Sequence, residues 1–442
     1  MKKIVILLSC AASLALSATN EELEAQINSL KAEVASMKSA NEEQSEALLN
    51  EVSSLQESIF APVDSYESVS SMGQAASKVY HAKNTVSIGG YGEYKFKKYS
   101  DFKNYKSDTA NETRNKSEFN IVRFVPYIGF KFNDWIVMNT EIEFENGGAR
   151  SDATNNYKYA IVEFSYLDFM FEPEYALRVG HILVPMGLTN LNHEPVAYLT
   201  TERPVVETFI IPSTWHTNGA LMHGKIDAFE YYGGVVTSPD AGDFVAGRFI
   251  QQGRLGARQF TDDFSLVFRG QYAFGGGLDI GGSFLYGDSS VLAEDRPGAS
   301  TGNTTAADIS ITMAEIHATY RNNGFDIKAM AAFGSLGDDV AELGAVPDEV
   351  NGQYITIGYD VLHAMGSSHK VYGVLDFERL DMDASSTTEN SDNHRFYEYS
   401  IGVAYFPDPK VVVKADYSTK DYASGANLAD ENCFTVQAGF IF

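Results

Sequence analysis

The sequence predicts an all-β protein, a 16-stranded antiparallel transmembrane β-barrel preceded by an N-terminal α-helical coiled coil. The last strand, 431–442, alternates apolar residues with small or polar ones and ends on Phe442. Connections between the candidate strands are alternately short and long. An apolar heptad pattern precedes the first strand. Alternation is required of a sheet that separates hydrocarbon from water, because one face meets lipid and the other the lumen.

Residues 1–18 have the features of a signal peptide. Two lysines are followed by an apolar run over 4–16 and small residues over 15–18. The run is shorter than the ~20 residues that a membrane-spanning helix needs. The residues around Cys10 resemble a lipoprotein signal, but the apolar run continues past Cys10. Cleavage near Ala18 is therefore favoured, and we expect export from the cytoplasm.

The composition excludes several classes of protein. No later apolar run is long enough for a transmembrane helix, which excludes a helical membrane protein. The net charge of −26 argues against nucleic acid as a partner. Once Cys10 leaves with the signal peptide, Cys433 is the one remaining cysteine, so no internal disulfide can form. The 25 Tyr, 28 Phe and 37 Gly suit the aromatic girdles and tight turns of a membrane barrel.

Residues 19–60 are predicted to form a periplasmic coiled coil. Apolar and polar seam positions are spaced alternately four and three residues apart. These positions are Leu23, Ile27, Leu30, Val34, Met37, Asn41, Gln44 and Leu48. A second four-residue step from Leu48 to Val52 is a stutter that unwinds the supercoil locally. The alternative is a single amphipathic helix lying on the barrel; the narrow seam and charged flanks favour oligomerisation instead.

Residues 61–84 are rich in Ser and Ala, have no strong period and are predicted to be a linker. The barrel is expected over 85–442. Its sixteen candidate strands are 86–99, 117–132, 135–147, 157–171, 175–184, 218–226, 228–239, 264–274, 277–289, 307–321, 324–335, 352–364, 369–383, 394–406, 410–422 and 431–442. An even number is what bacterial barrels have.

The alternation of loop lengths distinguishes a membrane barrel from other all-β folds. Short connections such as 133–134 and 275–276 alternate with long ones such as 100–116 and 240–263. With both termini in the periplasm, every short turn lies on the periplasmic side and every long loop lies outside. A soluble β-sandwich or propeller has no reason to separate its loops in this way. We therefore expect the protein in the bacterial outer membrane, with Phe440 and Phe442 as the signal read by the barrel-assembly machinery.

Charged residues are expected to face the lumen, because Arg or Lys on the lipid side costs roughly 2–4 kcal/mol at the midplane. In 410–422, for example, Lys414 and Asp416 share one face while Val411 and Val413 share the other. The same parity argument gives a set of candidate pore-lining residues. They are Arg123, Glu141, Glu143, Glu163, Arg178, Arg269, Glu315, His317, Lys414 and Asp416. Acidic and basic groups on separate strands can create a transverse field that orients solutes and filters ions.

The third long connection, 185–217, is predicted to fold inward and narrow the lumen. It is far longer than a hairpin loop requires and unusually apolar, so it needs a wall to pack against. A sixteen-stranded barrel leaves a channel wide enough to accommodate it. Its candidate constriction residues are His193, Glu194, Glu202, Arg203, Glu207 and His216. The alternative is that these polar groups only satisfy one another beneath a plug.

Four stretches resemble proteobacterial porins related to the phosphate-selective O/P type. They are KFNDWIVMNTEIEFENG at 131–147, VEFSYLDF at 162–169, RVGHILVPMG at 178–187 and ERP at 202–204. The arrangement Gly-x-x-x-Val-Pro-Met-Gly over 180–187 is the most specific. The resemblance covers 86 to about 220 and implies a homotrimeric diffusion pore, either general or anion-preferring. Phosphate selectivity does not carry over, since the loop has one Arg, no Lys and three Glu.

The function expected is therefore passive diffusion of ions and small hydrophilic solutes, without a cofactor. An enzyme in the barrel wall would need a Ser–His or Asp–His pair at the rim, and no local motif supports one. No metal site is expected, because no His/Cys/Asp cluster has ligand spacing. The third possibility is structural, a barrel that tethers the envelope or acts as an adhesin through its coiled coil.

Overall fold

The structure, a computed structural model, describes the following parts of the chain. They are residues 19–60, 67–102, 114–148, 160–245, 247–254, 256, 263–291, 307–344, 346–385, 391–426, 428 and 430–442. The expected signal peptide, 1–18, and the start of the expected linker, 61–66, lie outside these residues.

The chain divides into two compact units, one ending at Val63 and one starting at Asp64. In the first unit, a single helix α2 spans Asn20–Phe60, which confirms the predicted helix. Glu22 accepts a hydrogen bond from the Thr19 backbone N–H at 2.9 Å, and this closes the first turn. No helix among the described residues combines the length and the apolar character needed to cross a bilayer.

In the second unit, the described residues form sixteen strands, as predicted. The strands are β1 (Val86–Phe102), β2 (Arg114–Lys131), β3 (Ile136–Glu145), β4 (Ala160–Glu172), β5 (Tyr175–Leu183), β6 (His216–Ile226), β7 (Phe229–Thr237), β8 (Phe264–Gly275), β9 (Leu278–Val291), β10 (Ala307–Asn322), β11 (Phe325–Leu336), β12 (Glu349–Asp360), β13 (Lys370–Asp381), β14 (Arg395–Asp408), β15 (Val411–Tyr422) and β16 (Glu431–Ile441).

Short helical turns lie between some of these strands or precede them. They are α3 (Lys78–His81), α4 (Val206–Phe209), η1 (Ala241–Asp243), η2 (Gln251–Gly253), η3 (Asp338–Leu343), η4 (His363–Met365) and η5 (Ser391–His394).

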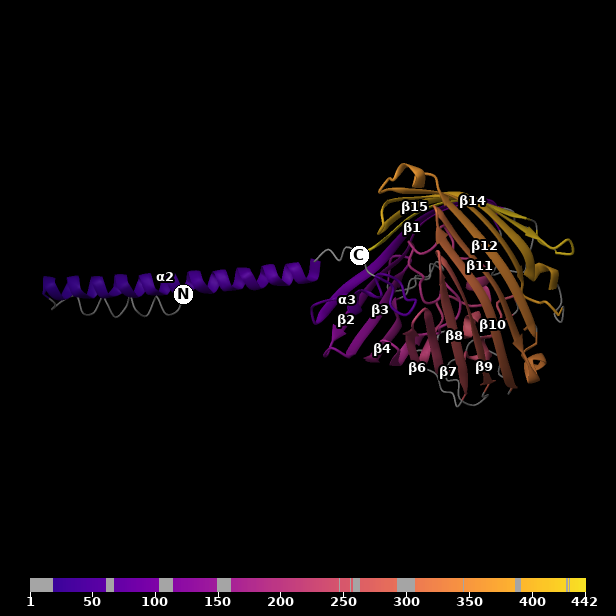
Figure 1. Cartoon of the computed structure of the whole chain (residues 1–442), viewed down its shortest axis with the longest axis horizontal. Helices are drawn as coiled ribbons and strands as arrows, with labels where there is room; N and C mark the ends of the chain where they lie inside the picture. The colour runs from indigo at the N-terminus through magenta and orange to yellow at the C-terminus, as the bar shows by residue number, and fades with distance from the viewer. Residues whose placement is uncertain are drawn as a thin grey trace. The chain divides into compact units, whose positions relative to one another are not determined.

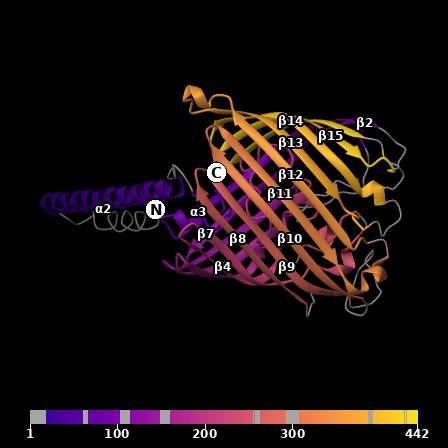
Figure 2. The same ribbon diagram turned by 45° about the vertical axis from the view of Figure 1, so that its right-hand side comes forward.

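Each strand pairs antiparallel with its sequence neighbours, and β1 pairs with β16 to close the barrel. The slanted strands can be followed around the barrel in Figures 1 and 2. Closure is completed at the last residue, where the Phe442 N–H donates to the Gly90 carbonyl at 2.9 Å. The Phe440 ring lies directly over Gly92, where a Cβ would come within 2.7 Å of the ring. A larger residue at position 92 would therefore have to displace this aromatic ring.

The two faces of the sheet have opposite chemistry, as the alternation predicted. On β8, Phe264, Leu266 and Phe268 are exposed on the outer face, whereas the alternating residues Ser265, Val267 and Arg269 are buried. Near one short turn, the Trp135 and Phe171 rings stack at 5.9 Å, consistent with the expected aromatic girdle. The outer face is therefore apolar and the inner face polar, which suits a barrel surrounded by lipid.

The connections alternate between short and long as predicted, and among the short ones the β12–β13 connection differs most from its expected length. The β12–β13 connection was expected over 365–368, but it runs from Asp360 to Lys370. The η4 turn ends at Gly366, whose φ of 63° is left-handed. A carboxylate oxygen of Asp360 accepts the N–H groups of Leu362 and Val371. β12 therefore ends at Asp360 rather than at 364, and β13 begins at Lys370 rather than at 369.

The hydrophobic core lies inside the barrel. Buried residues of the β5–β6 connection, among them Ile210, Ile211 and Trp215, belong to one cluster with inward-facing residues of the wall such as Leu285 and Val350. The core therefore forms where this loop packs against the inner face of the barrel wall.

Candidate functional site: the inward loop and the lumen wall

The β5–β6 connection, residues 184–215, crosses the inside of the barrel. Its polar groups bond to strands on opposite parts of the wall, as the next paragraphs describe. His216, predicted as a loop residue, is instead the first residue of β6, where its Nδ1 lies 2.7 Å from His181 Nε2. The other five predicted constriction residues lie on the loop itself.

Two glutamates fix the loop to β12 and β13. Glu378 on β13 accepts the backbone N–H of Val205 at 2.6 Å and of Val206 at 3.4 Å, and so caps the single turn α4. Glu207 in α4 accepts the N–H of Leu188 at 2.8 Å and the Tyr354 hydroxyl of β12 at 2.6 Å. Glu207 is thus an anchor rather than a free charge in the lumen.

On β1 and β15, the loop meets mainly basic side chains. Glu202 forms ion pairs with Lys95 at 3.0 Å and Lys97 at 2.6 Å on β1. Lys414 of β15 donates to the Thr200 carbonyl at 2.9 Å, and its Nζ lies 3.8 Å from the centre of the Tyr198 ring.

Asp416, two residues further along β15, accepts the Thr201 N–H at 2.7 Å. The predicted pore-lining residues Lys414 and Asp416 therefore hold the loop.

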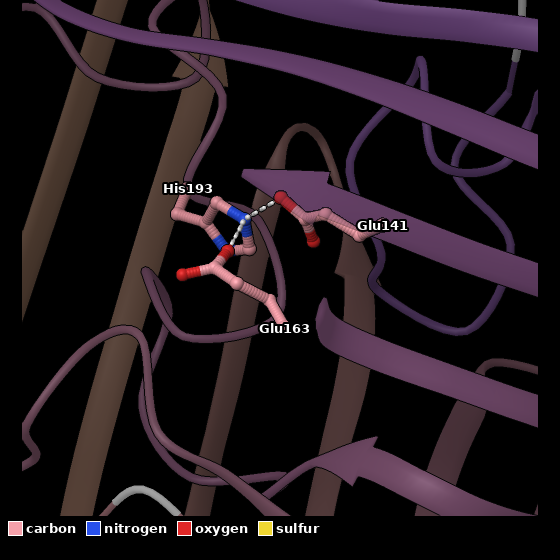
Figure 3. Close-up of side chains that lie close together, drawn as sticks. All are labelled: Glu141, Glu163 and His193. Atoms are coloured by element: carbon pink, nitrogen blue, oxygen red, sulfur yellow. Dashed lines mark hydrogen bonds and ion pairs between the residues drawn. The ribbon is translucent and has the colours of Figure 1, made fainter. Parts of the chain in front are cut away.

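A cluster of charged groups lies where the loop meets β3 and β4. His193 Nε2 lies 3.2 Å from Glu141 Oε1 and 3.6 Å from Glu163 Oε2 (Figure 3). All three side chains are buried. Burial lowers the pKa of His193 to about 4, more than the nearby Glu163 carboxylate raises it.

Next to this cluster, Arg123 of β2 contacts Glu93 of β1 at 2.9 Å and Glu143 of β3 at 3.4 Å.

A second inward segment is the described part of the expected linker, residues 67–84. Met72, Ala75, Ala76 and Val79 are buried in it. The Asn139 side chain of β3 donates to the Ala76 carbonyl at 2.8 Å. This stretch lacks a period in the sequence because its conformation depends on contacts with the wall.

The same segment meets the inward loop. The Ala76 N–H donates to Glu194 at 3.0 Å, and the Gly73 N–H donates to the Leu191 carbonyl at 3.2 Å. Burial raises the pKa of Glu194 to about 7, although hydrogen bonds from the backbone N–H groups of Gln74, Ala75 and Ala76 hold it down. The two inward segments therefore support each other.

Beneath this segment, a buried ion pair joins β4 and β5. Arg178 Nη2 lies 2.8 Å from Asp168 Oδ2, and both side chains are almost fully buried. Asp168 also accepts the Tyr80 hydroxyl at 2.7 Å and contacts His223 Nε2 at 2.7 Å. Arg178, a predicted pore-lining residue, therefore lies in a filled part of the lumen.

The remaining predicted pore-lining residues also lie on the inner face. Arg269 contacts the linker residue Ser71 at 3.2 Å. Glu315 accepts the Ser283 hydroxyl at 2.5 Å and contacts His317 Nδ1 at 2.8 Å. All ten predicted residues thus face inward, and most bind a neighbour on the wall, the loop or the linker.

Open space remains between the loop and the part of the wall formed by β10, β11, β13 and β14. A cavity of about 240 Å³ is lined by Gln74, by residues of the loop and by residues of the wall near the short turns. Charged groups of both signs line it, namely Glu194, Arg321, Asp326 and Lys370. Apolar side chains, among them Val196, Leu199 and Phe406, complete the lining.

Sequence reasoning did not single out several residues that position the loop or the segment 67–84. These are Lys95, Lys97, Asp168, Glu378, Lys328 and Tyr354. A signal existed for Lys95 and Lys97, which alternate with Tyr94 and Phe96 and so share the lumen face with Glu93. Glu378 gave no such signal, since neighbouring Arg379 obscures the alternation.

Comparison with known proteins places the chain in a family. No protein-family model matches it. It is 31% identical over 382 residues to an uncharacterized protein of Aquifex aeolicus (strain VF5), with 81% of each chain covered. The chain belongs to the family of this Aquifex aeolicus protein. The family is thus defined by sequence over most of both chains.

Solved structures of outer-membrane proteins share the fold of this chain. The outer membrane channel DcaP of Acinetobacter baumannii is 14% identical, with 81% of this chain and 97% of that chain covered and a TM-score of 0.51. A loop L8 deletion mutant of OmpT, an outer membrane protein of Vibrio cholerae, is 12% identical, with 81% and 100% covered and a TM-score of 0.50. The fold is therefore that of sixteen-stranded outer-membrane barrels. The closer relation to the phosphate-selective O/P type stays a prediction.

Proposed function

We propose that the chain is an outer-membrane porin, through which ions and small hydrophilic solutes diffuse passively. The observation that carries the proposal is the inward loop, 184–215, which bonds to β1, β12, β13 and β15 from inside a closed barrel. A barrel that served only as an anchor would gain nothing from a loop placed across its lumen. The loop instead suits a constriction that limits solute size.

The ion path is proposed to pass the cavity near the periplasmic turns. Lys370 lines that cavity and is exposed, so its charge acts on passing ions. Replacing a positive by a negative group at a narrow point favours cations. Lys370→Glu is therefore expected to raise the K⁺ to Cl⁻ permeability ratio severalfold, measured as the reversal potential under a KCl gradient.

Lys225→Glu is the matched control, because Lys225 is an exposed lysine near another short turn and does not line the cavity. An equal shift in both variants, or none in Lys370→Glu, would place the ion path elsewhere. Anion preference of the unmodified protein with block by phosphate would instead support the phosphate-selective alternative.

The helix α2 is proposed to join three copies of the chain as a periplasmic coiled coil. Its seam residues Ile27, Leu30, Val34, Met37 and Leu48 are 40–61% exposed in the single chain. Packing this seam against copies of itself removes apolar surface from water. A homotrimer is also what the sequence resemblance to porins related to the phosphate-selective O/P type implies. The alternative role is an envelope tether or adhesin, which need not conduct ions, so conductance separates the two.

A further inference from the structure

We propose that Glu141, Glu163 and His193 bind one divalent transition-metal ion of the zinc class, which links the inward loop to the barrel wall. The three residues come from β3, β4 and the loop, and Figure 3 shows their side chains converging. One ligand atom from each lies within 4.8 Å of the others. Each side chain is at most 2% exposed. Within the described part of the chain, no other group of three potential ligands meets these distances.

The separations between the ligand atoms fit a metal ion at their centre. Atoms that each lie about 2.1 Å from a metal are about 3.0 Å apart at a right angle and about 3.4 Å apart in a tetrahedron. The Nε2 atom of His193 lies 3.2 Å from Glu141 Oε1 and 3.6 Å from Glu163 Oε2. The two separations from His193 therefore match those of ligands that share one ion.

The hydrogen bonds around the cluster leave lone pairs of His193 Nε2 and of the Glu141 and Glu163 carboxylates directed toward one another. His193 Nδ1 lies 3.0 Å from the Asn190 carbonyl, which can only accept, so Nδ1 carries the proton. In the neutral ring, Nε2 then presents its lone pair to two carboxylates. Glu163 Oε2, fully buried, has no hydrogen-bond partner, and neither has Glu141 Oε2. Buried acceptors that face one another need a metal ion or a proton between them.

The surroundings hold the ligands in place, as they do in established metal sites. A metal-binding histidine usually donates its other N–H to a carbonyl or carboxylate, and Asn190 supplies that carbonyl here. The Thr214 hydroxyl donates to the second oxygen of Glu163. Arg203 Nη2 donates to the His193 carbonyl at 3.2 Å, which fixes the backbone of the ligand.

The donor set selects the kind of metal. Calcium and magnesium prefer oxygen ligands alone, whereas an imidazole with carboxylates suits zinc and its neighbours. Three protein ligands leave one position for water or for a second carboxylate oxygen. Sequence spacing gave no sign of this site, because its ligands come from three separate elements. The competing occupant is a proton shared between the acids and the imidazole.

Metal binding can be measured on the full-length protein without a polyhistidine tag. The protein in detergent is stripped with EDTA, dialysed, and titrated with Co²⁺ while visible absorbance is recorded. We expect one Co²⁺ per chain, with absorption bands that Zn²⁺ abolishes, and one Zn²⁺ per chain by elemental analysis. Glu163→Gln and His193→Ala are each expected to weaken binding by at least about tenfold.

His223→Ala is the matched control, because His223 is equally buried and contacts one carboxylate, Asp168, at 2.7 Å. It is expected to bind Co²⁺ as the unmodified protein does. Heat-dependent gel migration checks that each variant is folded, and Glu163→Gln keeps the native shape if His193→Ala does not fold. Absence of Co²⁺ bands in the unmodified protein, or unchanged affinity in Glu163→Gln, would overturn the proposal in favour of the proton. Equal loss in His223→Ala would also overturn it.

Discussion

Replacing residues 190–210 by a short Gly-Ser linker is expected to raise single-channel conductance severalfold. This segment contains the groups that bond to β1, β13 and β15 across the lumen. Its removal leaves the segment 67–84 and the two ends of the loop inside the barrel but opens the lumen between them, and a sixteen-stranded barrel is wide enough for an aqueous channel. The measurement is the current step per insertion in a planar bilayer at fixed KCl concentration and voltage.

Deleting residues 24–44 is the matched control for this loop variant. It removes the same number of residues from α2, as three whole heptads, and leaves the barrel unit unchanged. The control is expected to conduct as the unmodified chain does. If the loop variant, shown to be folded by gel migration, also conducts as the unmodified chain does, then the loop is not in the ion path.

Asp168→Ala is expected to destabilise the barrel by roughly 3–5 kcal/mol. Asp168 and Arg178 form an ion pair at 2.8 Å, and their side chains are 0% and 3% exposed. Removing the carboxylate leaves the guanidinium buried without its counter-charge, although the Tyr166 ring still lies 4.3 Å away. The expected result is a large fall in the temperature at which the heat-modifiable gel band is lost.

Glu118→Ala is the control for this prediction. Glu118 pairs with Lys116 at 3.4 Å, but both side chains are about half exposed, at 44% and 48%. Exposed pairs contribute about 1 kcal/mol or less, so this variant should melt close to the unmodified protein. If Asp168→Ala lowers the melting temperature as little as Glu118→Ala does, water must reach Arg178 and compensate its charge.

The overall architecture could be predicted from the sequence because each of its determinants is local. The alternation of Lys414 and Asp416 with Val413 and Ala415 is a property of one strand, and it assigned the faces correctly. The alternation of short and long connections can be predicted from the strand boundaries alone. The length and apolar character of the loop at 185–217 likewise predicted that it packs inside, within two residues of its observed limits.

The contacts of the loop could not be predicted, because they join residues far apart in the sequence. Nothing local pairs Glu378 with Val205, or Glu202 with Lys95. The stretch 67–84 was interpreted as a linker because it has no period, yet its Met72 and Val79 are buried against the wall. A segment that takes its conformation from the surface it covers carries no period of its own.

Single-channel recording of the unmodified protein tests the proposed porin most directly. The purified full-length chain is added to a planar bilayer in KCl, and the current steps and the reversal potential under a gradient are recorded. A porin that is narrowed by its inward loop and assembled as a trimer should give small steps in groups of three. The complete absence of conductance from folded protein would contradict a channel and favour a barrel that tethers the envelope.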